Sequence, residues 1–181
     1  YEGGTHVPAF WHWRGKLGEG VDINALTAHI DMFKTMADLA GAKIPAGIQK
    51  IDGRSMLPLL NNPKAKWRDR ELFVHQGRWA KGDDPNESKF KNCAVRTQRW
   101  RFVNNKDLYD ITKDPYEKVN VIDRHPDVVA KLRKAYDKWW VETVPLMVNE
   151  DAPYAPEQPQ KVRYEKQLAE KGIPAWKAPK L

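Results

Sequence analysis

The positions of apolar residues between residues 71 and 111 predict a small antiparallel sheet. Runs rich in β-branched and aromatic residues cover Cys93 to Thr97 and Trp100 to Val103, and another run follows at Leu108 to Ile111. Together they predict a meander of strands. Asn104-Asn105 predicts a turn, because asparagine tolerates positive φ. Glu71 to Gln76 adds one more strand, so we expect a four-stranded sheet.

An apolar stripe after Pro126 predicts the longest helix of the chain. Its positions recur three or four residues apart, at Val128, Leu132, Ala135 and Trp139. Proline is well tolerated in the first turn of a helix, whereas Pro145 predicts the end of this helix near Val144. We expect the helix to lie across one face of the small sheet, which makes this part of the chain α+β.

The N-terminal segments predict a buried strand and a short helix. Val7 to Trp13 is almost continuously apolar, which is typical of a strand covered on both faces. A helix begins near Asp31, a good N-cap, and ends at Gly41, where a left-handed residue is favoured. A methionine-containing stripe on this helix indicates core contacts rather than a cofactor site. The stripe consists of Met32, Met36 and Leu39.

Composition restricts the class of protein but not its partner. Hydrophobic residues make up 41% of the 181 residues and charged residues 30%, which is typical of a globular chain. The net charge of +7 favours anionic partners, whether nucleic acid, acidic glycans or sulfated substrates. The single cysteine, Cys93, excludes an internal disulfide. No apolar run approaches the length of about 20 residues that a membrane span needs.

Four ordered motifs resemble those of the formylglycine-dependent sulfatases, the type I arylsulfatase family. They are YEGGTHVPAFWHWRG, AHIDMFKTMADLAG, DGRSMLPLL, and the stretch AVRTQRWRF followed by LYDITKDPYEKVNV. Their order is that of the C-terminal region of the family. The resemblance implies the end of an alkaline-phosphatase-like α/β domain, a periplasmic or secreted location, and sulfuric ester hydrolysis by the parent protein.

This resemblance, with the local patterns, predicts three parts. Residues 1–62 form the C-terminal end of the large sulfatase α/β domain, and they contribute its last strand and helix. Residues 63–146 form the small α+β subdomain. Residues 147–181 form a proline-rich tail in which no helical or strand period survives, so we expect the tail either to wrap over the surface or to be disordered.

The resemblance also implies chemistry that these residues do not carry. Sulfatases of this family use a formylglycine made from the first residue of a C/S-x-P-x-R motif, beside a calcium ion. Cys93 is followed by Val95 and Thr97 where the motif needs proline and arginine, and no serine fits the pattern. The scattered aspartates show no grouping suited to calcium. We therefore expect this chain to be the C-terminal portion of a sulfatase and to be inactive alone. The formylglycine and the calcium are expected in the missing upstream part.

The loop after the first predicted strand is the candidate substrate contact. His75, Gln76 and Arg78 are donors suited to anionic or hydroxylated groups. The resemblance implies that this loop faces the substrate, a sulfated small molecule or glycan. Trp79 would add an aromatic platform, and His6 in the opening turn has a similar claim. The competing interpretation is a solvated basic loop with its tryptophan on the core.

The alternative function is a basic binding module for acidic polysaccharide or nucleic acid. Basic residues interleaved with aromatics can hold a phosphate backbone and stack bases. The cluster in question is Arg96, Arg99, Trp100 and Arg101. Alternation along a strand, however, puts Arg99 and Arg101 on one face and Trp100 and Phe102 on the other, as in an ordinary amphipathic strand. This pattern disfavours nucleic acid as a partner.

Overall fold

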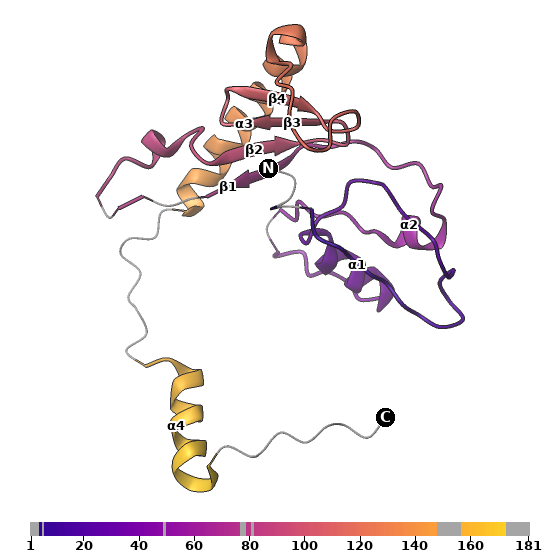
Figure 1. Cartoon of the computed structure of the whole chain (residues 1–181). Coiled ribbons are helices and arrows are strands. Elements are labelled where there is room, and N and C mark those ends of the chain that lie inside the picture. The colour runs from indigo at the N-terminus through magenta and orange to yellow at the C-terminus, as the bar shows by residue number, and fades with distance from the viewer. Residues whose placement is uncertain are drawn as a thin grey trace. The chain divides into compact units, whose positions relative to one another are not determined.

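The computed structural model of the chain divides into two compact units, Tyr1–Met147 and Val148–Leu181 (Figure 1). The structure describes residues 4, 6–48, 50–76, 79–80, 82–147 and 157–172. The first unit contains a sheet and most of the helices, and the second contains a helix of its own. The predicted division into residues 1–62, 63–146 and 147–181 stays a prediction.

The first unit contains the predicted four-stranded antiparallel sheet, with its strands side by side in chain order (Figure 1). The strands are β1 (Leu72–His75), β2 (Cys93–Arg96), β3 (Trp100–Val103) and β4 (Asp107–Asp110). The turn between β3 and β4 has φ 48° at Asn104 and 58° at Asn105. This confirms the predicted use of asparagine where the backbone is left-handed.

One face of the sheet packs against the long helix α3 (Pro126–Met147), which confirms the predicted α+β subdomain. The pairing register aligns one row of residues across the strands on that face: Phe73, Val95, Phe102 and Leu108. The buried residues of α3 that complete this core are Val129, Leu132, Tyr136 and Trp140. Apolar burial between sheet and helix therefore holds the subdomain together.

The buried face of α3 differs from the predicted stripe. Leu132 belongs to both, but three predicted positions lie half-buried at the edge: Val128, Ala135 and Trp139. The prediction placed Trp139 in the buried stripe, and this choice between the two adjacent tryptophans is wrong. Trp140 is the buried one, and its Nε1 donates to Oδ1 of Asn86 at 3.0 Å. The helix also continues past Pro145, where we expected it to end, because a proline near a helix end removes few backbone hydrogen bonds.

Two short helices, α1 (Asp31–Leu39) and α2 (Leu57–Asn61), lie in the N-terminal part of this unit, up to residue 62. Gly41 follows the C-cap of α1 with φ 62°, as predicted. The methionine stripe is not core, since Met32 is 40% exposed and Met36 is 45% exposed. The residues that α1 buries are instead the polar Asp31 and Thr35.

Asp31 joins three segments rather than capping α1 as predicted. The N-cap is Ile30, and Asp31 is the first helical residue. Its carboxylate is fully buried and accepts the backbone N–H groups of Ala28 and Arg54, each at 2.8 Å. The guanidinium of Arg70, which is itself buried, contacts both carboxylate oxygens, with Nη1 at 2.8 Å from Oδ1. A partner 39 residues along the chain therefore decides the role of this aspartate.

Gly53 permits the close approach of the loop before α2 to the start of α1. A Cβ atom at this position would lie 1.9 Å from the carbonyl oxygen of Ile30. Glycine alone fits such a contact between two backbones. The approach brings the N–H of the next residue, Arg54, within hydrogen-bond distance of Asp31.

The predicted strand from Val7 to Trp13 is wrong for this chain. Residues 6–13 have no strand pairing, and Val7 and Phe10 are 73% and 93% exposed. A strand needs a neighbour that accepts and donates its backbone hydrogen bonds. Among the described residues, no strand of the sheet pairs with this segment.

The second unit contains α4 (Pro159–Lys171), a helix that the sequence analysis missed in the proline-rich tail. Its signals are Pro159 in the first turn and Gly172, with φ 66°, directly after the end. Two ion pairs also mark the helix, each between residues one turn apart: Lys161–Glu165 and Lys166–Glu170. Such pairs support a helix without a packed face. The prolines on either side concealed this short period.

Candidate substrate-contact loop

The contact loop, residues 76–92, connects β1 to β2 and is described at residues 76, 79–80 and 82–92. Its base is closed by the N–H of Gln76, which donates to the carbonyl of Asn92 at 3.1 Å. Within the loop, a 3-10 turn (Pro85–Ser88) begins after Asp84, whose carboxylate accepts the N–H of Asn86 at 2.9 Å. The loop therefore has local structure of its own, as a long functional loop often does.

Helix α3 holds the contact loop from one side. The indole N–H of Trp140 donates to Asn86, and the ring of Phe90 stacks on Tyr136 at 4.7 Å between centroids. Phe90 has φ 61°, a conformation that a bulky residue rarely adopts. Its N–H donates to the Tyr136 hydroxyl at 3.3 Å. These contacts with α3 compensate for the strained backbone and fix the return of the loop to β2.

His75 lies at the end of β1 with its ring directed toward α3. Its Nε2 is 3.1 Å from the carbonyl oxygen of Ser88, and its ring meets the edge of Trp140 at 4.9 Å between centroids. The Nδ1 atom is buried and has no hydrogen-bond partner among the described residues. The side chain therefore contacts the loop and the helix, which gives His75 a role in holding the contact loop.

The other predicted substrate contacts are distributed over two segments. Gln76 is exposed at the base of the contact loop, and Trp79 is half-buried within it. Arg78 lies outside the described residues. His6 is exposed in the N-terminal segment. The set of His75, Gln76, Arg78 and His6 stays a prediction, and its exposed members among the described residues are Gln76 and His6.

The only cysteine of the chain, Cys93, is a core residue of β2, as expected. It is 6% exposed and belongs to the cluster between the sheet and α3. Burial raises the pKa of the Cys93 thiol above its ordinary value, although hydrogen bonds with Tyr136 and Asn104 oppose this shift. A buried thiol with a raised pKa is a poor nucleophile. The structure therefore agrees with the sequence pattern, which excludes Cys93 as a formylglycine precursor.

The basic cluster on the sheet is largely neutralised within the fold. The guanidinium of Arg99 donates to Oδ2 of Asp110 through Nε at 2.9 Å and Nη2 at 2.7 Å. Arg101 is buried, with its Nε 3.6 Å from Oε2 of the buried Glu117. Trp100 packs on the core of the sheet, as alternation along the strand predicts. This arrangement does not favour the alternative function of a nucleic-acid or polysaccharide binding module.

An apolar groove lies in the N-terminal part of the first unit, between residues 9–17 and the two short helices. The residues that line it are Ala9, Phe10, Trp11, His12, Trp13, Lys16, Leu17, Met32, Met36, Leu39, Leu57, Leu60 and Asn61. We call this surface the apolar groove. The sequence analysis assigned its methionines to a core. The same pattern of residues marks an apolar surface that is exposed within this unit.

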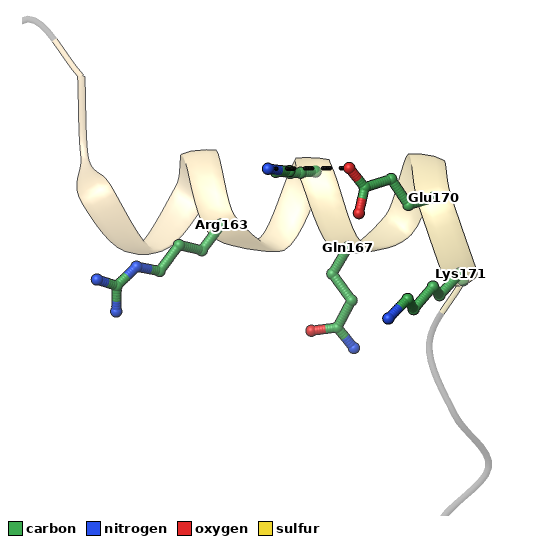
Figure 2. A pocket seen from close by; sticks show the side chains of 6 residues that line it. Arg163, Gln167, Glu170 and Lys171 are labelled. Carbon is green, nitrogen blue, oxygen red and sulfur yellow. Dashed lines mark ion pairs between the residues drawn. The ribbon is translucent and has the colours of Figure 1, made fainter.

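The surface of α4 is a solvated helix face rather than a site (Figure 2). Arg163, Gln167 and Lys171 extend from the helix, and the Lys166–Glu170 ion pair spans one turn at 3.9 Å (Figure 2). Every residue of α4 is exposed. Side chains of both charges along one exposed helix offer no enclosed position for a ligand.

The described residues do not fit the metal that the family uses. Across this part of the chain, no three histidine, cysteine, aspartate or glutamate side chains gather as a metal site would require. Calcium binds six to eight oxygen atoms that converge on it.

In the part of the chain that the structure describes, no helix combines the length and the apolar character that a membrane crossing needs.

Comparison with known proteins assigns this fold to a class. The family described as "N-sulphoglucosamine sulphohydrolase, C-terminal" matches residues 1–140. The chain belongs to this family, and its sheet and long helix are a C-terminal sulfatase domain homologous to those of arylsulfatases.

Individual relatives agree with this class. Arylsulfatase K of Xenopus laevis is 30% identical over 145 residues, which cover 74% of this chain and 26% of that protein. Arylsulfatase D of Homo sapiens is 36% identical over 89 residues, covering 46% of this chain and 15% of that protein. The crystal structure of Ps i-CgsB in complex with k-i-k-neocarrahexaose has the same fold, with a TM-score of 0.60 and 21% identity. It covers 88% of this chain and 33% of that one. The chain thus spans about a quarter of the length of arylsulfatase K.

Proposed function

We propose that this chain is the C-terminal portion of a sulfuric ester hydrolase, in which it completes the fold and borders the substrate cleft. The observation that carries the proposal is the match of the sulfatase C-terminal family to residues 1–140, which include the whole sheet and most of α3. In this proposal the chain holds no catalytic residue. The formylglycine and the calcium ligands belong to the remainder of the sulfatase.

The remainder of the sulfatase chain is the proposed partner of the apolar groove. Phe10, Trp13 and Met36 are 93%, 49% and 45% exposed around that groove. A contiguous apolar surface of this kind marks a contact with another protein surface. A sulfatase as long as arylsulfatase K has about three-quarters of its residues beyond the matched region, which is enough to cover the groove.

The proposed substrate class is a sulfated glycan or small sulfated molecule. Two observations support it. The net charge of +7 favours anionic ligands, and Ps i-CgsB, which shares the fold, was solved with k-i-k-neocarrahexaose. Gln76 and the neighbouring Arg78 would contact parts of such a substrate beyond the sulfate group that is hydrolysed.

The isolated 181-residue chain should release no product from 4-nitrocatechol sulfate, with or without added calcium. The full-length protein that contains it should hydrolyse this substrate. The comparison measures whether catalysis resides outside the chain. Turnover by the isolated chain that disappears on Cys93→Ala would contradict both the proposal and the core position of that thiol.

Alanine at Gln76 or Arg78 in the full-length protein should lower kcat/KM for a sulfated oligosaccharide and spare a small aryl sulfate. Binding energy from remote parts of a substrate is used in the transition state, and a small substrate never reaches those residues. We expect a loss of about threefold to tenfold for Gln76→Ala and about tenfold or more for Arg78→Ala, since hydrogen bonds to charged groups are stronger.

Two variants serve as controls for this prediction. Glu87→Gln changes an exposed residue of the same loop and should affect neither substrate. His75→Ala should reduce thermal stability as well as activity, because His75 packs against Trp140 and Ser88. If Gln76→Ala and Arg78→Ala lower kcat/KM equally for both substrates, these residues act in the sulfate pocket or in folding. If neither variant changes kcat/KM, the loop is a solvated surface.

A further inference from the structure

The tip of the β2–β3 hairpin makes side-chain contacts with the N-terminal part of the chain. The side-chain amide of Gln98 donates through Nε2 to the carbonyl of Asn24 at 2.8 Å. Its Oε1 accepts the N–H of Leu26 at 2.7 Å. One orientation of the amide satisfies both backbone groups, because the carbonyl needs a donor and the N–H needs an acceptor. Gln98 thus takes the place that a neighbouring strand would have beside residues 24–26.

The same hairpin is also bound to the segment that leads into β1. The backbone N–H of Gln98 donates to Oδ1 of Asp69 at 2.8 Å, and this oxygen also accepts the N–H of Arg70 at 2.9 Å. The indole N–H of Trp67 donates to the carbonyl of Leu26 at 3.0 Å. Both backbone groups of Leu26 are therefore engaged. We call this network, which consists of Asn24, Leu26, Trp67, Asp69 and Gln98, the hairpin joint.

The hairpin joint is continuous with the buried ion pair of the N-terminal part. Arg70 directly follows Asp69, and its guanidinium binds the carboxylate of Asp31 at the start of α1. In contrast, the hydrophobic cluster between the sheet and α3 contains no described residue before Phe73. That cluster therefore holds the sheet to α3, whereas the contacts of Gln98 connect the sheet to residues 24–69. The ion pair then holds the start of α1 to Arg70, which lies just before β1.

The hairpin joint and the contact loop lie at opposite ends of the same strands. In the register of β1 and β2, Leu72 pairs with Arg96 next to the hairpin, and His75 pairs with Cys93 next to the contact loop. Four strand residues span about 13 Å. A short hydrogen-bonded sheet moves as one body, so a tilt at the hairpin end displaces the loop at the other end.

We propose that Gln98 is a positioning residue that fixes the sheet on the N-terminal part and so sets where the contact loop meets the substrate. The first half of this proposal concerns the fold of the chain alone. The second half rests on the proposed function, because it requires a substrate at the loop. Two measurements separate the halves.

The first measurement is amide hydrogen exchange of the 181-residue chain, resolved to single residues by NMR. Gln98→Ala should speed exchange of the Leu26 N–H by about threefold to tenfold, the value of one net hydrogen bond. Exchange of Phe102 in β3 should not change. Lys50→Ala is the matched control, since it removes an exposed contact between Lys50 and Glu142, 2.9 Å apart, that also links the two parts. If the exchange rate of the Leu26 amide hydrogen is the same in Gln98→Ala as in wild type, the hairpin joint does not hold residues 24–26 as proposed.

The second measurement is kinetic and uses the full-length protein. From a panel of carrageenan and heparin hexasaccharides, the one that wild type hydrolyses fastest is compared with 4-nitrocatechol sulfate. Gln98→Ala should lower kcat/KM for the hexasaccharide about threefold to tenfold and leave the aryl sulfate unchanged. Equal losses of kcat/KM on both substrates would mean that Gln98 has a structural role only, which would contradict its role in positioning the contact loop. An unchanged kcat/KM on both substrates would contradict that role as well. If wild type hydrolyses no sulfate ester, the proposed function fails and positioning of substrate fails with it, while the exchange result still decides the joint.

Discussion

Replacing Asp31 with alanine should lower the free energy of unfolding by about 3 to 5 kcal/mol, because it leaves a buried guanidinium without its counter-charge. Asp31 is fully buried, and Arg70 is 7% exposed. The substitution also removes the acceptor for the N–H groups of Ala28 and Arg54. Urea denaturation followed by circular dichroism measures the loss.

Acid should act on the same ion pair. Burial raises the pKa of Asp31, but hydrogen bonds from Arg70, Arg54 and Ala28 outweigh it and hold this pKa below the ordinary value of 3.8. A lowered folded-state pKa means that the stabilisation is fully present above pH 3.8 and is lost as the pH falls through the folded-state value. The difference in stability between wild type and Asp31→Ala should therefore shrink below about pH 4.

Asp52→Ala is the matched control for the Asp31 prediction. Asp52 forms an exposed pair with Lys50 at 3.4 Å, and its loss should leave the unfolding midpoint unchanged within error, as for most surface pairs. If Asp31→Ala lowers the free energy of unfolding by no more than Asp52→Ala does, water reaches the charge of Arg70. The ion pair would then not be the central contact of the N-terminal part.

Trp140→Ala should cost about 3 to 5 kcal/mol of stability, since it opens a large cavity between the sheet and α3. The side chain is 2% exposed and packs against Tyr136 and His75. The substitution also removes the donor to Asn86, so the contact loop should exchange its amide hydrogens faster. Thermal unfolding and hydrogen exchange measure the two effects.

Two further variants separate packing from hydrogen bonding at Trp140. Trp140→Phe keeps most of the apolar area and loses only the bond from Nε1 to Asn86, which is worth about 1 kcal/mol. Val141→Ala changes a residue that is 69% exposed on the same helix and should have no measurable effect. The core position of Trp140 is wrong if its alanine variant is as stable as that of Val141.

The sequence predicted the sheet and the long helix because their signals are local. The strand runs at Cys93 to Thr97 and Trp100 to Val103 are rich in β-branched and aromatic residues, and the asparagine pair supplies positive φ at the turn. A slip of the register by one residue would expose Phe102, which is buried, so burial of this side chain favours the observed pairing with Val95. The family assignment depended on ordered motifs, which are also readable without a structure.

The sequence predicted which segment holds the candidate site, but it did not predict how the side chains of that segment are oriented. Donor-rich composition located the contact loop, yet it could not show that His75 faces Trp140 while Gln76 is exposed. Strand alternation separates the two residues by face, but it does not say which face α3 covers. The hairpin joint left no sequence signal, because Gln98 binds backbone groups 72 and 74 residues away.

By itself, the amino-acid sequence determined the meander and its additional strand, the α+β character of the C-terminal subdomain, the sulfatase family, and the absence of a formylglycine motif around Cys93. Only the tertiary structure decided which tryptophan of α3 is buried, that Asp31 binds Arg70 instead of capping a helix, and that the methionines of α1 line an open groove. The physical reason is the distance along the chain over which each kind of interaction acts. Turn preferences and periodicity act within a few residues, whereas a buried ion pair or an exposed apolar face depends on segments that the fold alone brings together.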